Sequence, residues 1–250
     1  MLLLYNVAMK ILIIRHGDPD YEHDTLTRHG WREAEYLAEM LSKQDIKLFY
    51  TSPYGRAKDT ASVTLEKMGR EAEVLPWLRE FDVMIDRPDK PDMKKIPWDW
   101  LPQDWTQDPR FYDKDKWAEN ERMAAGNVGD AYREVTEQFD ALMERHGYRR
   151  EGGYYRAVRP NHDTIAMFCH FGVESVLLSH IMGVSPMTLW HHSCAAPTSV
   201  TTLVTEERRE GIATFRMTAF GETTHLYMHS EEPSFSARFC ECFGDDTRHD

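Results

Sequence analysis

Two short apolar runs, each followed by a histidine, organise the chain. Residues 11–14 lead into an Arg-His-Gly turn at 15–17, and residues 164–169 lead into His170. A continuous apolar run rich in β-branched residues is typical of a strand buried on both faces of a parallel sheet. Ligands bind at the carboxyl ends of such strands in open α/β sheets. We therefore expect both histidines at a ligand-binding edge of the sheet.

Helical periodicity alternates with further strand patterns. Thr27 is a predicted N-cap for an amphipathic helix, and Ser52 with Pro53 predicts the start of a second helix that stops at Gly69. Two more helices are expected over residues 128–146 and from His170 to Gly183, and strands or hairpins over 47–51, 72–75, 153–158 and 198–220. This alternation predicts an α/β fold, a three-layer α/β/α sandwich with a mostly parallel central sheet.

Residues 83–127 interrupt the pattern with five prolines and four tryptophans. So many aromatic residues argue against disorder, and a segment this long is often functional. We expect a folded insertion that caps the site, with a peripheral subdomain or a dimer contact as the alternative. The remainder predicts one domain over residues 1–250, with a peripheral polar tail from about residue 231.

Net charge, the N-terminal segment and the cysteines indicate which partners and which cellular compartment to expect. The chain has 250 residues and a formal net charge of −12, which argues against a nucleic acid or an anionic membrane. The apolar N-terminus lacks the basic region and cleavage site of a leader, so neither a signal peptide nor a membrane span is expected. Cys240 and Cys242 form no zinc-type pattern, and free thiols in a cytoplasmic protein are the preferred interpretation.

The residues at the strand ends suggest a phosphate pocket. Arg15 and His16 follow the first buried strand, His170 follows the second, and Arg56 lies about one turn into the helix after Ser52. A guanidinium group presents a planar fork of donors to phosphate oxygens, and an imidazole can act as donor or nucleophile. An anionic small molecule is therefore compatible with an acidic protein that concentrates positive charge locally.

The motifs RHG, LTRHGWREA, SPYGRAKDTA, LREFD and CHFG occur in this order, and together they resemble the histidine phosphatase superfamily, in its phosphoglycerate-mutase-like branch 1. The resemblance implies that His16 is a nucleophile that forms a phosphohistidine and that Glu80 is the general acid and base. It further implies that Arg15, Arg56 and His170 hold the phosphoryl oxygens. Glu22, His23 and Phe171 are expected to contact the substrate. Glu22 stands where mutases of the family carry asparagine, and Phe171 separates His170 from the following glycine.

These features predict a phosphomonoester hydrolase that acts on a small phosphorylated metabolite through a phosphohistidine, without a metal or other cofactor. A phosphomutase of the phosphoglycerate mutase type, or a phospho-ligand binding protein with little activity, are the alternatives. A metal site is disfavoured because no HExxH-like arrangement is present. The identity of the substrate and the oligomeric state are left open.

Overall fold

The computed structural model describes residues 8–90, 92–235 and 241–244. Its strands are β1 (Lys10–Arg15), β2 (Pro19–Asp20), β3 (Thr25–Leu26), β4 (Leu48–Thr51), β5 (Ala72–Val74), β6 (Ile85–Asp86), β7 (Lys94–Lys95), β8 (Tyr148–Glu151), β9 (Tyr154–Ala157), β10 (Thr164–Cys169), β11 (Val200–Arg209) and β12 (Ile212–Glu222). Its helices are α1 (Arg28–Leu41), α2 (Gly55–Met68), α3 (Pro102–Trp105), α4 (Glu121–Ala125), α5 (Val128–Arg145), α6 (Phe171–Met182), α7 (Pro186–His192) and α8 (Thr224–Met228), with the 3-10 turns η1 (Pro76–Leu78), η2 (Pro109–Tyr112) and η3 (Trp117–Glu119).

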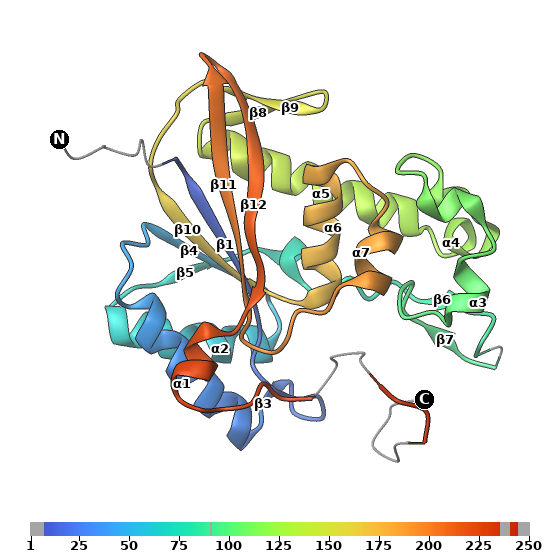
Figure 1. The fold of residues 1–250 in the computed structure, drawn as a ribbon, viewed down its shortest axis with the longest axis horizontal. Coiled ribbons are helices and arrows are strands. Elements are labelled where there is room, and N and C mark those ends of the chain that lie inside the picture. The colour runs from blue at the N-terminus through green and yellow to red at the C-terminus, as the bar shows by residue number, and fades with distance from the viewer. Residues whose placement is uncertain (1–7, 91, 236–240, 245–250) are drawn as a thin grey trace.

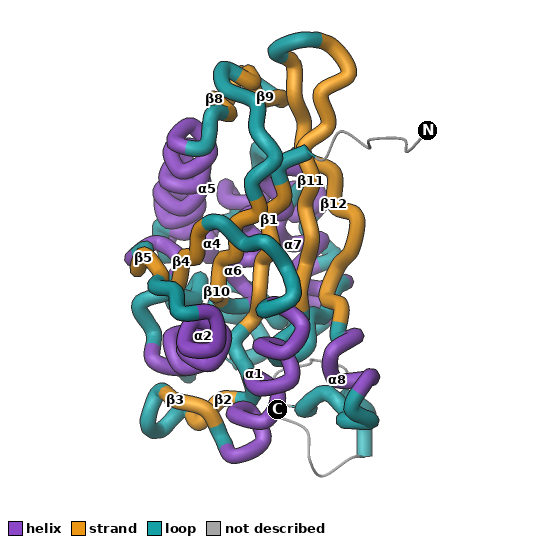
Figure 2. Tube along the Cα trace, turned by 90° about the vertical axis from the view of Figure 1, so that its left-hand side faces the viewer, coloured by secondary structure: helices purple, strands orange, loops and turns teal. Residues whose placement is uncertain are grey.

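An eight-stranded sheet of order β5-β4-β10-β1-β11-β12-β9-β8 forms the centre of the fold. The first four strands are parallel, as predicted for the buried apolar runs, and the pairs from β1 to β8 are antiparallel. Figure 2 shows the order from β5 to β12 across the view. The two predicted histidine-ended strands, β1 and β10, are direct neighbours, so their carboxyl ends meet at one point of the sheet edge.

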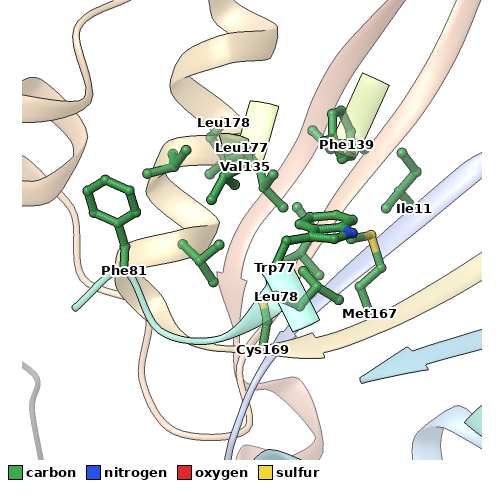
Figure 3. Packing of buried hydrophobic residues seen from close by; sticks show 14 of the residues in the cluster. Ile11, Trp77, Leu78, Phe81, Val135, Phe139, Met167, Cys169, Leu177 and Leu178 are labelled. Atoms are coloured by element: carbon green, nitrogen blue, oxygen red, sulfur yellow. The ribbon is translucent and has the colours of Figure 1, made fainter. Parts of the chain in front are cut away.

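Helices cover both faces of this sheet, which confirms the predicted α/β/α layering (Figure 1). Alternate residues of a strand point to opposite faces, so β1 supplies two cores. Leu12 and Ile14 pack with side chains of α1 and α2, whereas Ile11 and Ile13 pack with α5 and α6. Figure 3 shows the second core, where Trp77 of η1 lies beside Met167. The loop after η1, which carries Glu80, is thereby fixed against the sheet.

Capping residues mark the start of α1 and the end of α2. Thr27 caps α1 by accepting a hydrogen bond from the Gly30 amide, and Gly69 ends α2 in the left-handed conformation, both as predicted. The predicted start of α2 at Ser52 and Pro53 is wrong, because the helix begins at Gly55 and the Ser52 hydroxyl is instead held by His170. The hairpin expected over residues 153–158 also begins earlier, at β8.

The tryptophan-rich insertion is folded, and its aromatic side chains are buried. Trp98, Trp100, Trp105 and Trp117 are between 1% and 6% exposed and belong to the core under α6 and α7. Trp98 reaches the loop that holds Glu80, since its indole N–H donates to the Phe81 carbonyl 3.0 Å away. The insertion therefore completes a core and touches the candidate site through Trp98. Its role as a cap over substrate stays a prediction.

Part of the predicted tail is anchored to α1. The Ser234 amide donates to a carboxylate oxygen of the buried Glu33 at 3.0 Å, and Glu231 pairs with Arg32. Of the cysteines, Cys169 is buried and Cys242 is exposed, while Cys240 lies outside the described residues. Among the described residues no helix has the length and apolarity needed to cross a membrane.

Candidate active site

His16 lies directly after β1 with its ring in a fixed orientation. Its Nδ1 is 2.7 Å from the carbonyl oxygen of Gly17, and the side chain is 2% exposed. A carbonyl only accepts, so Nδ1 carries the proton and Nε2 keeps its lone pair. The Gly17 amide in turn donates to the Thr60 hydroxyl at 2.9 Å, which ties the catalytic turn to α2. The result is a neutral imidazole with one nucleophilic nitrogen.

His170 stands beside His16 because β1 and β10 pair in register at Arg15 and Cys169. The two ring centroids are 5.0 Å apart. Nε2 of His170 lies 2.7 Å from the Ser52 hydroxyl, and its buried Nδ1 has no hydrogen-bond partner among the described residues. A buried polar nitrogen without a partner costs free energy unless a ligand satisfies it. This nitrogen can therefore serve a ligand oxygen.

Two guanidinium groups complete the positive side of the site. Arg15 is 2% exposed and donates from Nη1 to the carbonyl of Ala195. Arg56 projects from the first turn of α2, where its Nη1 donates to Asp24 at 2.7 Å and its Cζ lies 4.8 Å from the Tyr54 ring centroid. Nε of Arg56 is buried and has no partner among the described residues. Both cations are thus oriented before any anion binds.

Glu80 lies between η1 and β6, at the start of α6. Its carboxylate accepts hydrogen bonds from the amides of Phe81 at 2.7 Å, Gly172 at 3.3 Å and Val173 at 3.1 Å. A Cβ atom at Gly172 would come within 2.5 Å of a Glu80 oxygen, so any side chain there would displace Glu80 or the neighbouring Trp98. The amides at this helix start therefore position the carboxyl group.

The electrostatic environment separates the protonation states of these groups. Burial, with help from Arg15 and Arg56, lowers the pKa of His16 well below its usual value. Burial also lowers the pKa of His170, and the neighbouring His16 contributes. Burial raises the pKa of Glu80 against the opposing effect of its amide donors and the two arginines. The site thus favours neutral imidazoles and a carboxyl group that can hold a proton.

Five of the predicted residues meet in this arrangement, namely Arg15, His16, Arg56, Glu80 and His170. Glu22 and His23 lie in an exposed turn, where the His23 ring is 2.9 Å from Asp20. Phe171 is buried with its ring against Trp98, 5.8 Å between centroids. Contact of these three with substrate stays a prediction.

Sequence reasoning missed three supporting groups: the Ser52 hydroxyl on His170, the Asp24 carboxylate on Arg56, and the Gly172 amide on Glu80. The sequence pattern at Ser52 predicts a helix cap and not a contact to His170, while Asp24 gives no signal beyond its place in an acidic loop. Among the described residues no group of three His, Cys, Asp or Glu side chains is placed to hold a metal ion.

Curated relatives match only part of the chain. A 2,3-bisphosphoglycerate-dependent phosphoglycerate mutase of Thermoplasma acidophilum is 38% identical over 74 residues, which is 25% of this chain and 37% of the relative. A probable phosphoglycerate mutase of Serratia proteamaculans is 29% identical over 86 residues, 31% of this chain and 40% of the relative. The matched segments thus span well under half of either relative's length.

Solved structures show the same fold over most of the chain. Phosphoserine phosphatase of Entamoeba histolytica, in complex with phosphoserine, superposes with a TM-score of 0.55 at 18% identity, covering 87% of this chain and 99% of its own. A mycobacterial glucosyl-3-phosphoglycerate phosphatase gives a TM-score of 0.54 at 18% identity, with coverages of 85% and 98%. A family model describing the histidine phosphatase superfamily, branch 1, matches residues 11–218. With that match spanning both histidine-ended strands and the intervening helices, the chain belongs to branch 1 of the histidine phosphatase superfamily.

Proposed function

We propose that the protein hydrolyses phosphate monoesters of a small metabolite through a phosphohistidine on Nε2 of His16. The observation that carries this proposal is the 2.7 Å contact between His16 Nδ1 and the Gly17 carbonyl. It fixes the tautomer with a free lone pair on Nε2, in a ring that feels the charges of Arg15 and Arg56 and whose centroid is 5.0 Å from that of His170. Histidine is an established covalent nucleophile, and phosphoryl transfer depends mainly on positioning and charge stabilisation.

In the first step the Nε2 lone pair of His16 attacks phosphorus, and the bond from phosphorus to the ester oxygen breaks. Arg15, Arg56 and His170 hold the three equatorial oxygens, where negative charge is concentrated. The Glu80 carboxylic acid gives its proton to the departing oxygen and becomes a carboxylate. Its raised pKa supports this role, because the acid must be protonated when the ester bond breaks.

In the second step the Glu80 carboxylate takes a proton from water, whose oxygen attacks the phosphohistidine. The bond between phosphorus and Nε2 breaks, and His16 returns to its neutral form with inorganic phosphate released. The two guanidinium groups supply the positive charge that this chemistry needs. We therefore propose that activity is independent of metal and survives thorough chelation. We propose separately that the protein works in the cytoplasm.

A phosphomutase is the second candidate, because both curated relatives are named phosphoglycerate mutases. In that reaction the phosphoryl group on His16 passes to a hydroxyl of a bound intermediate instead of to water. The two activities share every residue above and differ in the acceptor. Release of inorganic phosphate, measured against formation of an isomerised phosphoester, distinguishes them.

The covalent intermediate provides the direct test. The protein is mixed with a phosphate monoester labelled with phosphorus-32 and quenched in base, in which phosphohistidine is stable. We expect label on His16, loss of that label in acid, and no label in His16→Ala. His29→Ala, which alters a half-buried histidine on α1, should label normally. Acid-stable label, or label that persists in His16→Ala, would overturn the assignment.

A further inference from the structure

A cavity outside the catalytic site lies at the opposite end of the parallel strands from the catalytic residues. Its volume is about 400 Å³, and it opens beside the amino ends of β4 and β10, the end of α5 and the loop that precedes β10. The catalytic histidines follow the carboxyl ends of β1 and β10, so the two sites are separated by the length of the strands. Figure 1 shows β1 running from this edge, at the upper left, toward the centre of the molecule.

The lining of this cavity is positively charged, in contrast to the chain as a whole. Lys47, Arg145 and Arg159 line it together with one carboxylate, Asp163, whereas the formal net charge of the protein is −12. Burial lowers the pKa of His146 at the cavity wall. All three cations lower this pKa further, against the effect of Asp163. Basic side chains gathered around a concave surface focus a positive potential and attract anions.

The cations retain capacity for a ligand. Arg159 donates one bond from Nη2 to the Arg145 carbonyl at 2.6 Å and has no carboxylate partner among the described residues. Lys47 pairs with Asp163 at 2.8 Å, and Arg145 pairs with Glu73, but these side chains are 61% and 55% exposed. Exposed ion pairs contribute little free energy, so a ligand oxyanion can share or replace them at low cost.

The walls are ordered by hydrogen bonds that do not involve a ligand. The hydroxyl of the buried Tyr50 lies 2.8 Å from Nε2 of His146, and the Asn161 side chain donates to the His146 carbonyl at 2.7 Å. Gly147 has a φ of +93°, and a Cβ there would meet the Arg159 carbonyl at 2.3 Å, so the two loops touch only because this residue is glycine. A preformed wall lowers the ordering cost of binding.

We propose that this cavity is a binding site for a small polyanion, which carries two or more phosphate or carboxylate groups and is held by Arg159, Lys47 and Arg145. Guanidinium groups match the paired oxygens of both kinds of anion, and the lysine adds a point charge. The site is distinct from the phosphate pocket at His16 and does not depend on the function proposed for it.

The test uses the whole protein saturated with vanadate, which occupies the catalytic pocket under the proposed function. Inorganic pyrophosphate and citrate are titrated separately by isothermal titration calorimetry, so that phosphate and carboxylate ligands are distinguished. We expect one equivalent of at least one probe to bind. Arg159→Gln should weaken that binding at least tenfold, because a charge-assisted hydrogen bond is lost. Lys47→Gln should weaken it to a lesser degree.

Arg149→Gln is the matched control, since Arg149 is exposed on β8, outside the cavity, and its loss changes the net charge equally. It should bind the probe as the unaltered protein does, and Arg159→Gln should keep full activity toward p-nitrophenyl phosphate. Equal weakening in Arg149→Gln would reduce the effect to overall charge and overturn the site. Absence of binding by both probes at about 1 mM would overturn it as well. Both outcomes are measured by binding and not by catalysis. They therefore stand whether or not His16→Ala loses activity.

Discussion

The Ser52 hydroxyl oxygen and Nε2 of His170 are 2.7 Å apart, and the same oxygen accepts a hydrogen bond from the Tyr54 amide at 3.2 Å. The amide uses only one of the two lone pairs of this oxygen, and we expect the serine proton to be donated to Nε2, because the buried Nδ1 is then the nitrogen that can donate to a ligand. That places the imidazole proton on Nδ1, the nitrogen that has no partner among the described residues. Ser52 is thus a positioning residue that prepares His170 to donate to a phosphoryl oxygen.

Replacing Ser52 by alanine should therefore slow phosphorylation of His16. The loss should be about tenfold, the effect of one hydrogen bond near the reacting group. Single-turnover kinetics measure this rate, and a melting curve shows whether the variant is folded. Ser62→Ala removes an exposed hydroxyl from α2 and should change neither quantity. An unchanged rate in Ser52→Ala would show that His170 needs no tautomer control.

Gly172 allows a second test, because Glu80 occupies the space that a side chain at position 172 would need. In Gly172→Ala the new Cβ would lie 2.5 Å from a Glu80 oxygen and 2.9 Å from the Trp98 indole nitrogen. Gly172 lies in the first turn of α6, where the helix preference for alanine over glycine is smaller than the interior value of about 1 kcal/mol, so a melting curve checks that the variant folds. Displacement of the acid should reduce turnover of an alkyl phosphate by roughly 10²-fold or more.

The control for this substitution is Gly153→Ala, in the turn between β8 and β9, where no atom lies within 4 Å of the added Cβ. It should retain full turnover. If the two variants lose turnover to a similar degree, the loss in Gly172→Ala does not come from displacement of Glu80.

Sequence reasoning succeeded where one local pattern determined one structure. The apolar runs before His16 and His170 predict buried strands, which the structure confirms, and the rule for parallel sheets places their carboxyl ends at a ligand site. It failed where distant residues decide. The order of β12, β9 and β8 on the antiparallel side depends on long-range pairing, which no local pattern contains. The prediction for Ser52 is wrong because a helix cap and a contact to His170 both use the same hydroxyl, and the sequence does not distinguish them.

Glu174 provides a prediction about pH. Its carboxyl group, on α6, is 1% exposed, and burial raises its pKa from 4.5 to about 7, against the effects of the Thr201 hydroxyl and Arg15. The folded state therefore holds the proton more tightly than the unfolded state. The corresponding stability is fully present below pH 4.5 and is lost as the pH rises through 7, by roughly 3 kcal/mol in total.

Glu174→Gln should remove this loss. The variant should match the unaltered protein near pH 4.5 and exceed its free energy of unfolding above pH 7, measured by urea denaturation across that range. Glu35→Gln, on the exposed face of α1, should leave the pH dependence unchanged. Parallel curves for Glu174→Gln and the unaltered protein would mean that Glu174 does not titrate abnormally.

The final prediction concerns Glu80 and the basicity of the leaving group. An alkoxide leaving from a sugar or alcohol phosphate needs a proton, whereas p-nitrophenolate departs readily without one. Glu80→Gln keeps the size of the side chain and an oxygen that can accept from Phe81 and Val173. Phosphorylation of His16 by an alkyl phosphate should therefore slow roughly 10²–10⁴-fold, and phosphorylation by p-nitrophenyl phosphate much less.

The contrast must be measured in a single turnover, because Glu80 also activates water in the second step and steady-state rates would combine the two roles. Asp82→Asn is the matched control. Asp82 is two residues away and accepts a hydrogen bond from Tyr54 at 2.6 Å, so its loss should affect the two substrates alike. If Glu80→Gln slows the two substrates equally, Glu80 positions the phosphate without transferring a proton. A selective loss in Asp82→Asn would then identify Asp82 as the acid.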